Sequence, residues 1–184
     1  VSRPFLAQVT RHRIASFSVQ SQRYVRLDDF RYVVPPEIEA IPEAKEAFLA
    51  SMEEDAKRYL DLAHKLEEGH TARLMAEGMP EKQARAKASK QANEDARFVL
   101  PNACETKMVV TMNARSLQNF FHLRCCSRAQ WEIRDAACAA LAALRKTSPL
   151  LFSLYGPSCF VSGKCPEGRM TCGRQAEIQR KFSE

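Results

Sequence analysis

The stretch NARSLQNFFHLR at residues 113–124 decides the fold, because it joins two different patterns of hydrophobicity. Upstream of it, residues 106–112 are apolar and β-branched, which predicts a buried strand. Downstream, apolar side chains recur every three to four positions through residues 115–146, which predicts a helix with a kink or break at 125–127. A strand that leads directly into a long helix, without regular alternation of the two along the chain, favours an α+β fold.

Outward from this stretch, most of the chain is expected to be helical. Three further segments have helical spacing or composition: residues 1–10, 43–67 and 81–97. Two segments are expected to be extended: residues 17–24 and 30–34. Gly69 or Gly78 is expected to end the central helix, and Pro149 to end the later one. Residues 156–174 are rich in Gly, Pro and Cys, which predicts a structured loop.

Size and charge narrow the class of protein. The chain has 184 residues, which suit one domain, and we expect residues 1–150 as its core and residues 151–184 as a cysteine-containing tail of the same domain. The net charge of +6 is spread over single arginines, which favours anionic partners such as nucleotides and folates over nucleic acid. The longest uncharged apolar run, 136–144, is too short to span a membrane. Seven cysteines without a secretory signal suggest reduced thiols in a cytoplasmic protein.

The first cluster of polar and cationic side chains lies near the start of the chain. Its members are hydrogen-bond donors and cations within fourteen residues: Arg11, His12, Arg13, Ser16, Ser21, Arg23 and Tyr24. Guanidinium groups bind phosphate and carboxylate in a bidentate manner, so this composition predicts an anion site. The alternative is a solvated polar loop.

The second cluster of polar and cationic side chains lies at the predicted strand-to-helix junction. Asn113 and Arg115 begin the helix, and Asn119 lies one turn beyond Arg115 on the same face. An Asn amide donates and accepts at once, which suits the edge of a heterocycle. Asn113 could instead be only an N-cap. Arg97 ends a predicted helix, where interaction with the helix dipole is the simpler explanation.

Together these segments resemble one family. Arg11-His12-Arg13, followed after seven residues by Ser21 and then by Arg23-Tyr24, resembles the signature of flavin-dependent thymidylate synthases. A second block resembles that family in order and spacing: Leu100-Pro101, residues 113–117, Asn119-Phe120, Leu123-Arg124 and residues 129–134. The resemblance implies an antiparallel sheet flanked by helices, with a further N-terminal region before the segment that starts at Val1.

The resemblance also implies roles for individual residues. The positions that match dUMP contacts are Gln8, Ser21, Arg23, Arg97 and Arg124, with Gln20 in place of a side chain that the family has at Val19. The positions that match FAD contacts are Arg11, His12, Arg13, Asn113, Arg115 and Asn119. Arg124 matches the position that touches the uracil ring, and a fixed cation there stabilises negative charge on the ring, which makes Arg124 the expected catalytic residue.

The implied reaction is the reductive methylation of dUMP to dTMP. In the family, methylenetetrahydrofolate donates the one-carbon unit, reduced FAD supplies the hydride, NADPH is the reductant, and the site is shared between subunits of a homotetramer. Neither nucleic acid nor a membrane is an expected partner. An inactive synthase-like fragment that acts as an interaction or nucleic-acid-binding module is the alternative, and a helical scaffold built on residues 43–97 is a third.

A nucleophilic thiol or hydroxyl and a zinc site are further alternatives. Cys125 and Cys126 follow Arg124, which could lower a thiol pKa, but the resemblance implies no thiol nucleophile. Ser21 has no visible base partner, so phosphate binding is preferred. Cys159, Cys165 and Cys172 could bind zinc with a fourth ligand from Cys138 or from an N-terminal region, but their spacing lacks close pairs, and no metal site is expected.

Overall fold

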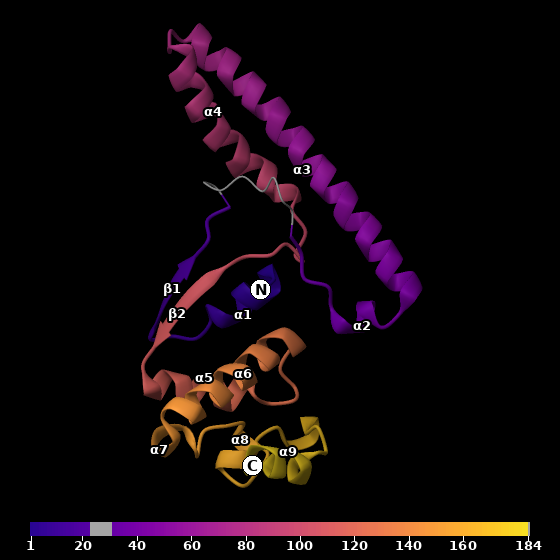
Figure 1. The fold of residues 1–184 in the computed structure, drawn as a ribbon, viewed down its shortest axis with the longest axis vertical. Helices are drawn as coiled ribbons and strands as arrows, with labels where there is room; N and C mark the ends of the chain where they lie inside the picture. The colour runs from indigo at the N-terminus through magenta and orange to yellow at the C-terminus, as the bar shows by residue number, and fades with distance from the viewer. Residues whose placement is uncertain (23–30, 184) are drawn as a thin grey trace. The chain divides into compact units, whose positions relative to one another are not determined.

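The computed structural model describes residues 1–22 and 31–183. This part of the chain is mostly helical and contains a small antiparallel sheet of two strands (Figure 1), which confirms the α+β class. The chain forms two compact units, unit 1 from Val1–Pro4 and Ser18–Met108, and unit 2 from Phe5–Phe17 and Val109–Glu184. The separate core and tail predicted for residues 1–150 and 151–184 stay a prediction.

Unit 1 is dominated by a helical hairpin of α3 (Pro42–Ala76) and α4 (Glu81–Ala96), which lie side by side (Figure 1). The short helix α2 (Pro36–Glu39) precedes the hairpin, and the 3-10 turn η1 (Arg97–Val99) follows it. Both α2 and α3 begin with proline, whose fixed φ suits the first helical turn and whose missing N–H loses no bond there.

Helix α3 is longer than its sequence pattern predicts. It continues through Gly69, whose cost of about 1 kcal/mol in a helix is outweighed by good helix formers on both sides. It ends instead at Gly78, which has a φ of +90°. The Gly78 N–H donates to the Met75 carbonyl and the Met79 N–H to the Leu74 carbonyl, and Met79 packs against Leu74. This is the Schellman arrangement, in which glycine takes the left-handed position.

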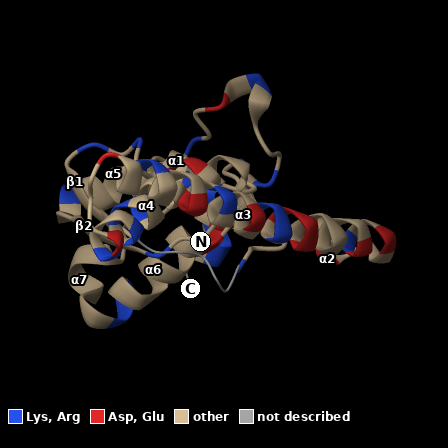
Figure 2. Ribbon diagram, turned by 90° about the horizontal axis from the view of Figure 1, so that it is seen from above, with Lys and Arg blue, Asp and Glu red and all other residues tan. Residues whose placement is uncertain are grey.

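Small side chains hold the hairpin together. Helix α4 buries an alanine every four residues, at 84, 88, 92 and 96, and none of the four is more than 1% exposed. Such a stripe lets two helix backbones approach closely. Ala96 packs with Tyr59 and Ala63 of α3, while Ala84 and Ala88 pack with Leu74. The outer face of α3 is charged (Figure 2) and includes the exposed pairs Arg58–Glu54 and Lys65–Asp61.

The strands are β1 (Ala15–Val19) and β2 (Met108–Met112), and they pair with each other. The prediction that the second strand is buried is wrong: Val109 is 68% exposed and Val110 is 37% exposed. β-Branched residues favour extended backbone whether or not a layer covers them, so composition alone does not establish burial. The strand expected at 30–34 is also wrong in its described part, residues 31–34, where Tyr32 makes only an isolated bridge to Cys104.

Unit 2 is a set of helices around an apolar core. Its elements include most of α1 (Arg3–Val9), then α5 (Ala114–Arg124), α6 (Trp131–Thr147), α7 (Pro149–Phe152), α8 (Ser158–Val161), η2 (Gly168–Met170) and α9 (Gln175–Ser183). Phe121 of α5 and Ile133, Ala137 and Leu141 of α6 are at most 2% exposed. These side chains anchor α5 and thereby position the residues at its two ends.

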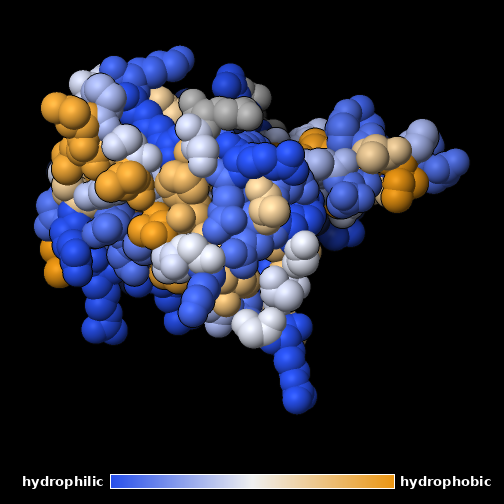
Figure 3. All heavy atoms as spheres, turned by 90° about the horizontal axis from the view of Figure 1, so that it is seen from below, coloured by the Kyte–Doolittle hydropathy of each residue, from blue (hydrophilic) through white to orange (hydrophobic). Residues whose placement is uncertain are grey.

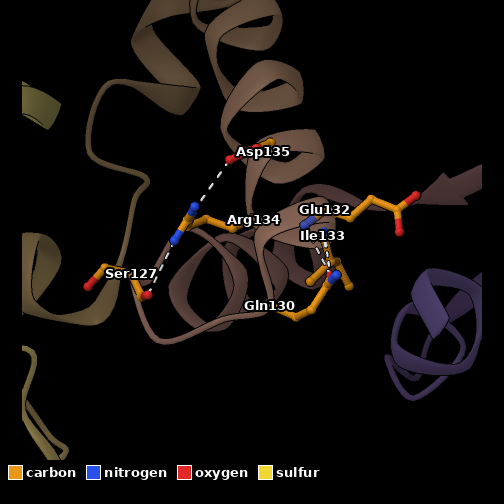
Figure 4. A network of polar contacts seen from close by, with 6 residues as sticks. All are labelled: Ser127, Gln130, Glu132, Ile133, Arg134 and Asp135. Carbon is orange, nitrogen blue, oxygen red and sulfur yellow. Dashed lines mark hydrogen bonds and ion pairs between the residues drawn. The ribbon is translucent and has the colours of Figure 1, made fainter. Parts of the chain in front are cut away.

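The predicted break after residue 124 is confirmed, and side-chain bonds stabilise it (Figure 4). The Gln130 side chain caps α6 by accepting hydrogen bonds from the N–H groups of Glu132 at 3.1 Å and Ile133 at 3.2 Å. Arg134 reaches back to donate to the Ser127 carbonyl at 3.3 Å. At the other end, α6 stops at residue 147, two residues before Pro149, as predicted, and Pro149 is the first residue of α7.

Candidate active site

The Arg-His-Arg segment follows α1 in a turn that separates its side chains. Arg11 and Arg13 are exposed, whereas His12 is only 7% exposed and packs edge-on against the Phe120 ring, with centroids 5.0 Å apart. Ile14 ends the turn with a φ of 59°, although it is β-branched and 77% exposed. A strained, exposed apolar residue of this kind is typical of a binding site.

Arg124, the last residue of α5, contacts this turn and the helix that precedes it. Its Nε donates to His12 Nε2 at 2.9 Å, and its Nη2 donates to the Gln8 carbonyl at 3.4 Å. The two distant blocks of the sequence therefore meet inside unit 2. Of the predicted site residues, the structure brings Gln8, His12 and Arg124 into direct contact.

The contact determines the protonation of His12. Because Nε2 accepts from Arg124, the neutral imidazole carries its proton on Nδ1. Burial, and then the charge of Arg124, lower the pKa of His12 below 6.5. Burial also lowers the pKa of Arg124 from 12.5, but a guanidinium remains charged at neutral pH. A neutral histidine thus orients a half-buried permanent cation.

A second group of predicted residues surrounds an open hollow of ≈ 420 Å³ in unit 2. Three of its lining residues are predicted FAD contacts, namely Arg13, Arg115 and Asn119. The hollow is held in shape by Ser116, whose hydroxyl donates to the Ile14 carbonyl at 3.0 Å. Its rim is cationic and rich in amide donors, so it suits an anionic group attached to a heterocycle.

Asn113 is the N-cap of α5. Its side-chain oxygen accepts from the Ser116 N–H at 2.8 Å, which satisfies a backbone donor of the first turn. The alternative left open by the sequence is therefore observed, and a contact of Asn113 with FAD stays a prediction.

Arg97 is a predicted dUMP residue that lies in unit 1. Its Nε donates to the Glu94 carbonyl at 3.0 Å, the helix-end interaction expected of an arginine there, and its guanidinium lies 5.9 Å from the Phe98 ring centroid. Arg97 also lines a hollow of ≈ 260 Å³ with Arg3 and Gln22, two residues that no sequence motif indicated. Gln20 is exposed, Ser21 is half-buried, and Arg23 lies outside the described residues.

Cys125, the first of the two cysteines that follow Arg124, lacks the features of a reactive thiol. All seven cysteines are free thiols. Cys125 is buried, and its hydrogen bond with Cys138, followed by burial, raises its pKa, which disfavours the reactive thiolate. In the described part of the chain, no three His, Cys, Asp or Glu side chains are grouped so as to hold a metal ion. No helix described in the structure is long and apolar enough to cross a membrane.

Comparison with known proteins agrees with the resemblance of the two blocks. The model of the thymidylate synthase complementing protein family matches residues 1–150. The flavin-dependent thymidylate synthase of Clostridium tetani is 51% identical over 182 residues, which cover 99% of this chain and 70% of that relative. The enzyme of the same name from Geobacter sulfurreducens is 45% identical over 186 residues, covering 100% and 69%.

A crystal structure of the flavin-dependent thymidylate synthase ThyX from Helicobacter pylori, complexed with FAD and dUMP, is 26% identical to this chain. It aligns with a TM-score of 0.49 over 83% of this chain and 67% of that one. The family match and the curated relatives define the class as thymidylate synthases that depend on a flavin. The chain belongs to the flavin-dependent thymidylate synthase family.

Proposed function

We propose that this chain converts dUMP to dTMP, with methylenetetrahydrofolate as the one-carbon donor, FAD as the flavin and NADPH as the reductant that recharges it. The relatives support the reaction class, since proteins 51% and 45% identical to nearly the whole chain carry the name flavin-dependent thymidylate synthase. The observation that carries the proposal is the contact of Arg124 with His12 and Gln8, because it joins the two sequence blocks into one cationic site.

Arg124 is the proposed catalytic residue. The lone pair of His12 Nε2 and the Gln8 carbonyl hold its guanidinium, so the cation needs little reorganisation when a substrate binds. Such a preorganised cation beside the uracil ring stabilises the negative charge that develops as C5 becomes nucleophilic. His12 stays neutral and orients Arg124, since protonation of Nε2 would remove the acceptor.

The remaining contacts are proposed from the resemblance and the geometry together. For dUMP they are Gln8, Gln20, Ser21, Arg23, Arg97 and Arg124. For FAD they are Arg11, His12, Arg13, Asn113, Arg115 and Asn119, and the hollow lined by Arg13, Arg115 and Asn119 fits an anionic group on a heterocycle. When bound, the reduced flavin supplies the hydride for the transferred carbon.

Self-association as a homotetramer is part of the proposal. Large apolar side chains are exposed on both units, including Phe98 at 82%, Leu150 at 99% and Leu154 at 75%. Hydrophobic surface also gathers on one side of the face shown in Figure 3. Exposed patches of this kind are typical of surfaces that contact another protein. Sedimentation velocity should show a species of four chains, and a monomer across the working concentration range would contradict this part.

The test is a flavin oxidation assay. The purified protein should show flavin absorbance, and the absorbance of the reduced flavin should change on addition of dUMP with methylenetetrahydrofolate, with formation of dTMP. Omission of dUMP is the control. A protein that holds flavin but forms no dTMP would overturn the assignment, as would a colourless protein that instead binds DNA with a steep dependence on salt.

A further inference from the structure

Two arginines line one open hollow of ≈ 260 Å³ in unit 1. Arg97 begins η1 and is a proposed dUMP contact, whereas Arg3 is the first residue of α1 and lies outside both sequence blocks that indicate the family. The other residues that line the hollow are uncharged, namely Gln22, Phe98, Leu100 and Asn102. Among the described residues of this lining, therefore, no carboxylate balances the two guanidinium charges.

Backbone hydrogen bonds fix Arg3 beside the segment that follows η1. The Arg3 N–H donates to the Asn102 carbonyl at 3.1 Å, and the Thr106 N–H donates to the Val1 carbonyl at 2.7 Å. These bonds tie residues 1–3 to residues 102–106 without using the Arg3 side chain. The backbone that carries the guanidinium is therefore already ordered, so a ligand that binds to it loses less free energy in ordering the chain.

The side chains of Arg97 and Gln22 are held by hydrogen bonds. The Arg97 Nε donates to the Glu94 carbonyl at 3.0 Å. The Gln22 Nε2 donates to the Sγ of Cys104 at 3.5 Å, and Cys104 is only 1% exposed. A guanidinium and a primary amide each have further N–H donors, so these bonds orient the two side chains and leave donors for a ligand.

An anion with several oxygens suits this set of groups. Two like charges in one hollow repel each other, and a phosphate monoester, with a charge of about −1.5 to −2 at pH 7, offsets both. Guanidinium groups bind phosphate in a bidentate manner, and the oxygens of one phosphate can accept from both arginines. A nucleoside has no such charge. The hollow therefore suits the phosphate end of a nucleotide rather than its sugar or base.

We propose that Arg3 binds the 5′-phosphate of dUMP jointly with Arg97, and that this contact selects the nucleotide over the nucleoside. The inference rests on the proposed function, which assigns Arg97 to dUMP. The phosphate is not the reacting group, so Arg3 binds the ground state and the transition state equally well. Arg3 is therefore a residue for substrate binding and not a catalytic residue.

The first test measures dUMP binding to the full chain by isothermal titration calorimetry. Arg3→Gln removes the charge and leaves the backbone bond to Asn102 in place, and loss of one charge-assisted contact should weaken dUMP binding by about 10- to 100-fold. The affinity for deoxyuridine, which lacks the phosphate, should stay the same. Arg3→Lys keeps the charge without the planar donors and should recover part of the affinity. Arg85→Gln is the matched control, since Arg85 forms an exposed pair with Glu81, and it should bind dUMP as the unmodified chain does.

The second test uses steady-state kinetics. Arg3→Gln should raise the KM for dUMP and leave kcat unchanged, which is the result of losing uniform binding. Unchanged dUMP affinity in Arg3→Gln overturns the assignment, even where the unmodified chain forms dTMP. An equal loss of affinity for dUMP and deoxyuridine indicates a structural role and also overturns it, as does loss of FAD with dUMP affinity intact. A chain that forms no dTMP but binds dUMP through Arg3 refutes the proposed reaction and supports the phosphate contact.

Discussion

Replacing Arg124 by alanine tests the contact on which the candidate site depends. The substitution removes the donor to His12 Nε2 at 2.9 Å and the donor to the Gln8 carbonyl at 3.4 Å. Because His12 is only 7% exposed, water cannot readily replace the lost donor. Leaving one buried polar group unsatisfied costs about 1–3 kcal/mol, so we expect the free energy of unfolding to fall by that amount.

The catalytic effect should be larger than the effect on stability. Loss of one preorganised donor at a developing charge lowers kcat by roughly 10²–10³. The two effects can be measured on one preparation. Urea denaturation followed by circular dichroism gives the free energy of unfolding, and dTMP formation at saturating dUMP gives kcat. Arg85→Ala is the matched control, since Arg85 lies on α4 and forms an exposed pair with Glu81. It should change stability by less than about 1 kcal/mol and leave kcat unchanged.

Two results would refute the reasoning about Arg124. If Arg124→Ala keeps the rate of the unmodified protein, the guanidinium does not stabilise the reacting ring. If the variant is as stable as the unmodified chain, the bond to His12 contributes nothing to the fold. Arg124→Lys separates charge from geometry, since lysine keeps the charge but lacks the planar donors that reach both partners.

Three further predictions concern stability. His12 is held neutral with a pKa below 6.5, so the unfolded chain binds a proton at a higher pH than the folded chain does. The free energy of unfolding should therefore fall as the pH drops from 6.5 through the folded pKa. Urea denaturation between pH 8 and 5 should show this fall, and His12→Gln should reduce the dependence of the unfolding free energy on pH. Gly69→Ala should stabilise α3 by about 0.5–1 kcal/mol, because nothing lies within 4 Å of the added Cβ; a lower melting temperature would contradict it. Gly156→Ala should cost about 1–3 kcal/mol in the same assay, because its Cβ would meet the Phe160 ring at 2.8 Å; no change would show that the ring moves freely.

Local patterns were enough to predict much of the secondary structure. The helices over 81–97 and 1–10 and the break after residue 124 are confirmed within a few residues, because helical spacing, proline and good helix formers act over short distances. The prediction of where α3 ends was less accurate. Either Gly69 or Gly78 could end a helix, and only the second adopts the left-handed conformation that does so.

Burial and long-range contacts were harder to predict. The run at 106–112 has the composition of a buried strand, but β2 exposes Val109 and Val110, since exposure depends on what packs above a strand and not on the strand itself. Arg3 and Gln22 line a hollow with Arg97 although no local signal marks them.

The amino-acid sequence by itself determined the family and the chemistry that is available, because two blocks of arginines, asparagines and a histidine carry a recognisable order and spacing. Only the tertiary structure decided which of those side chains touch. It paired Arg124 with a neutral His12 across 112 positions, and it placed Arg3 in one hollow with Arg97. The physical reason is that spacing along a chain specifies local geometry, whereas contacts between distant residues depend on how complete helices pack.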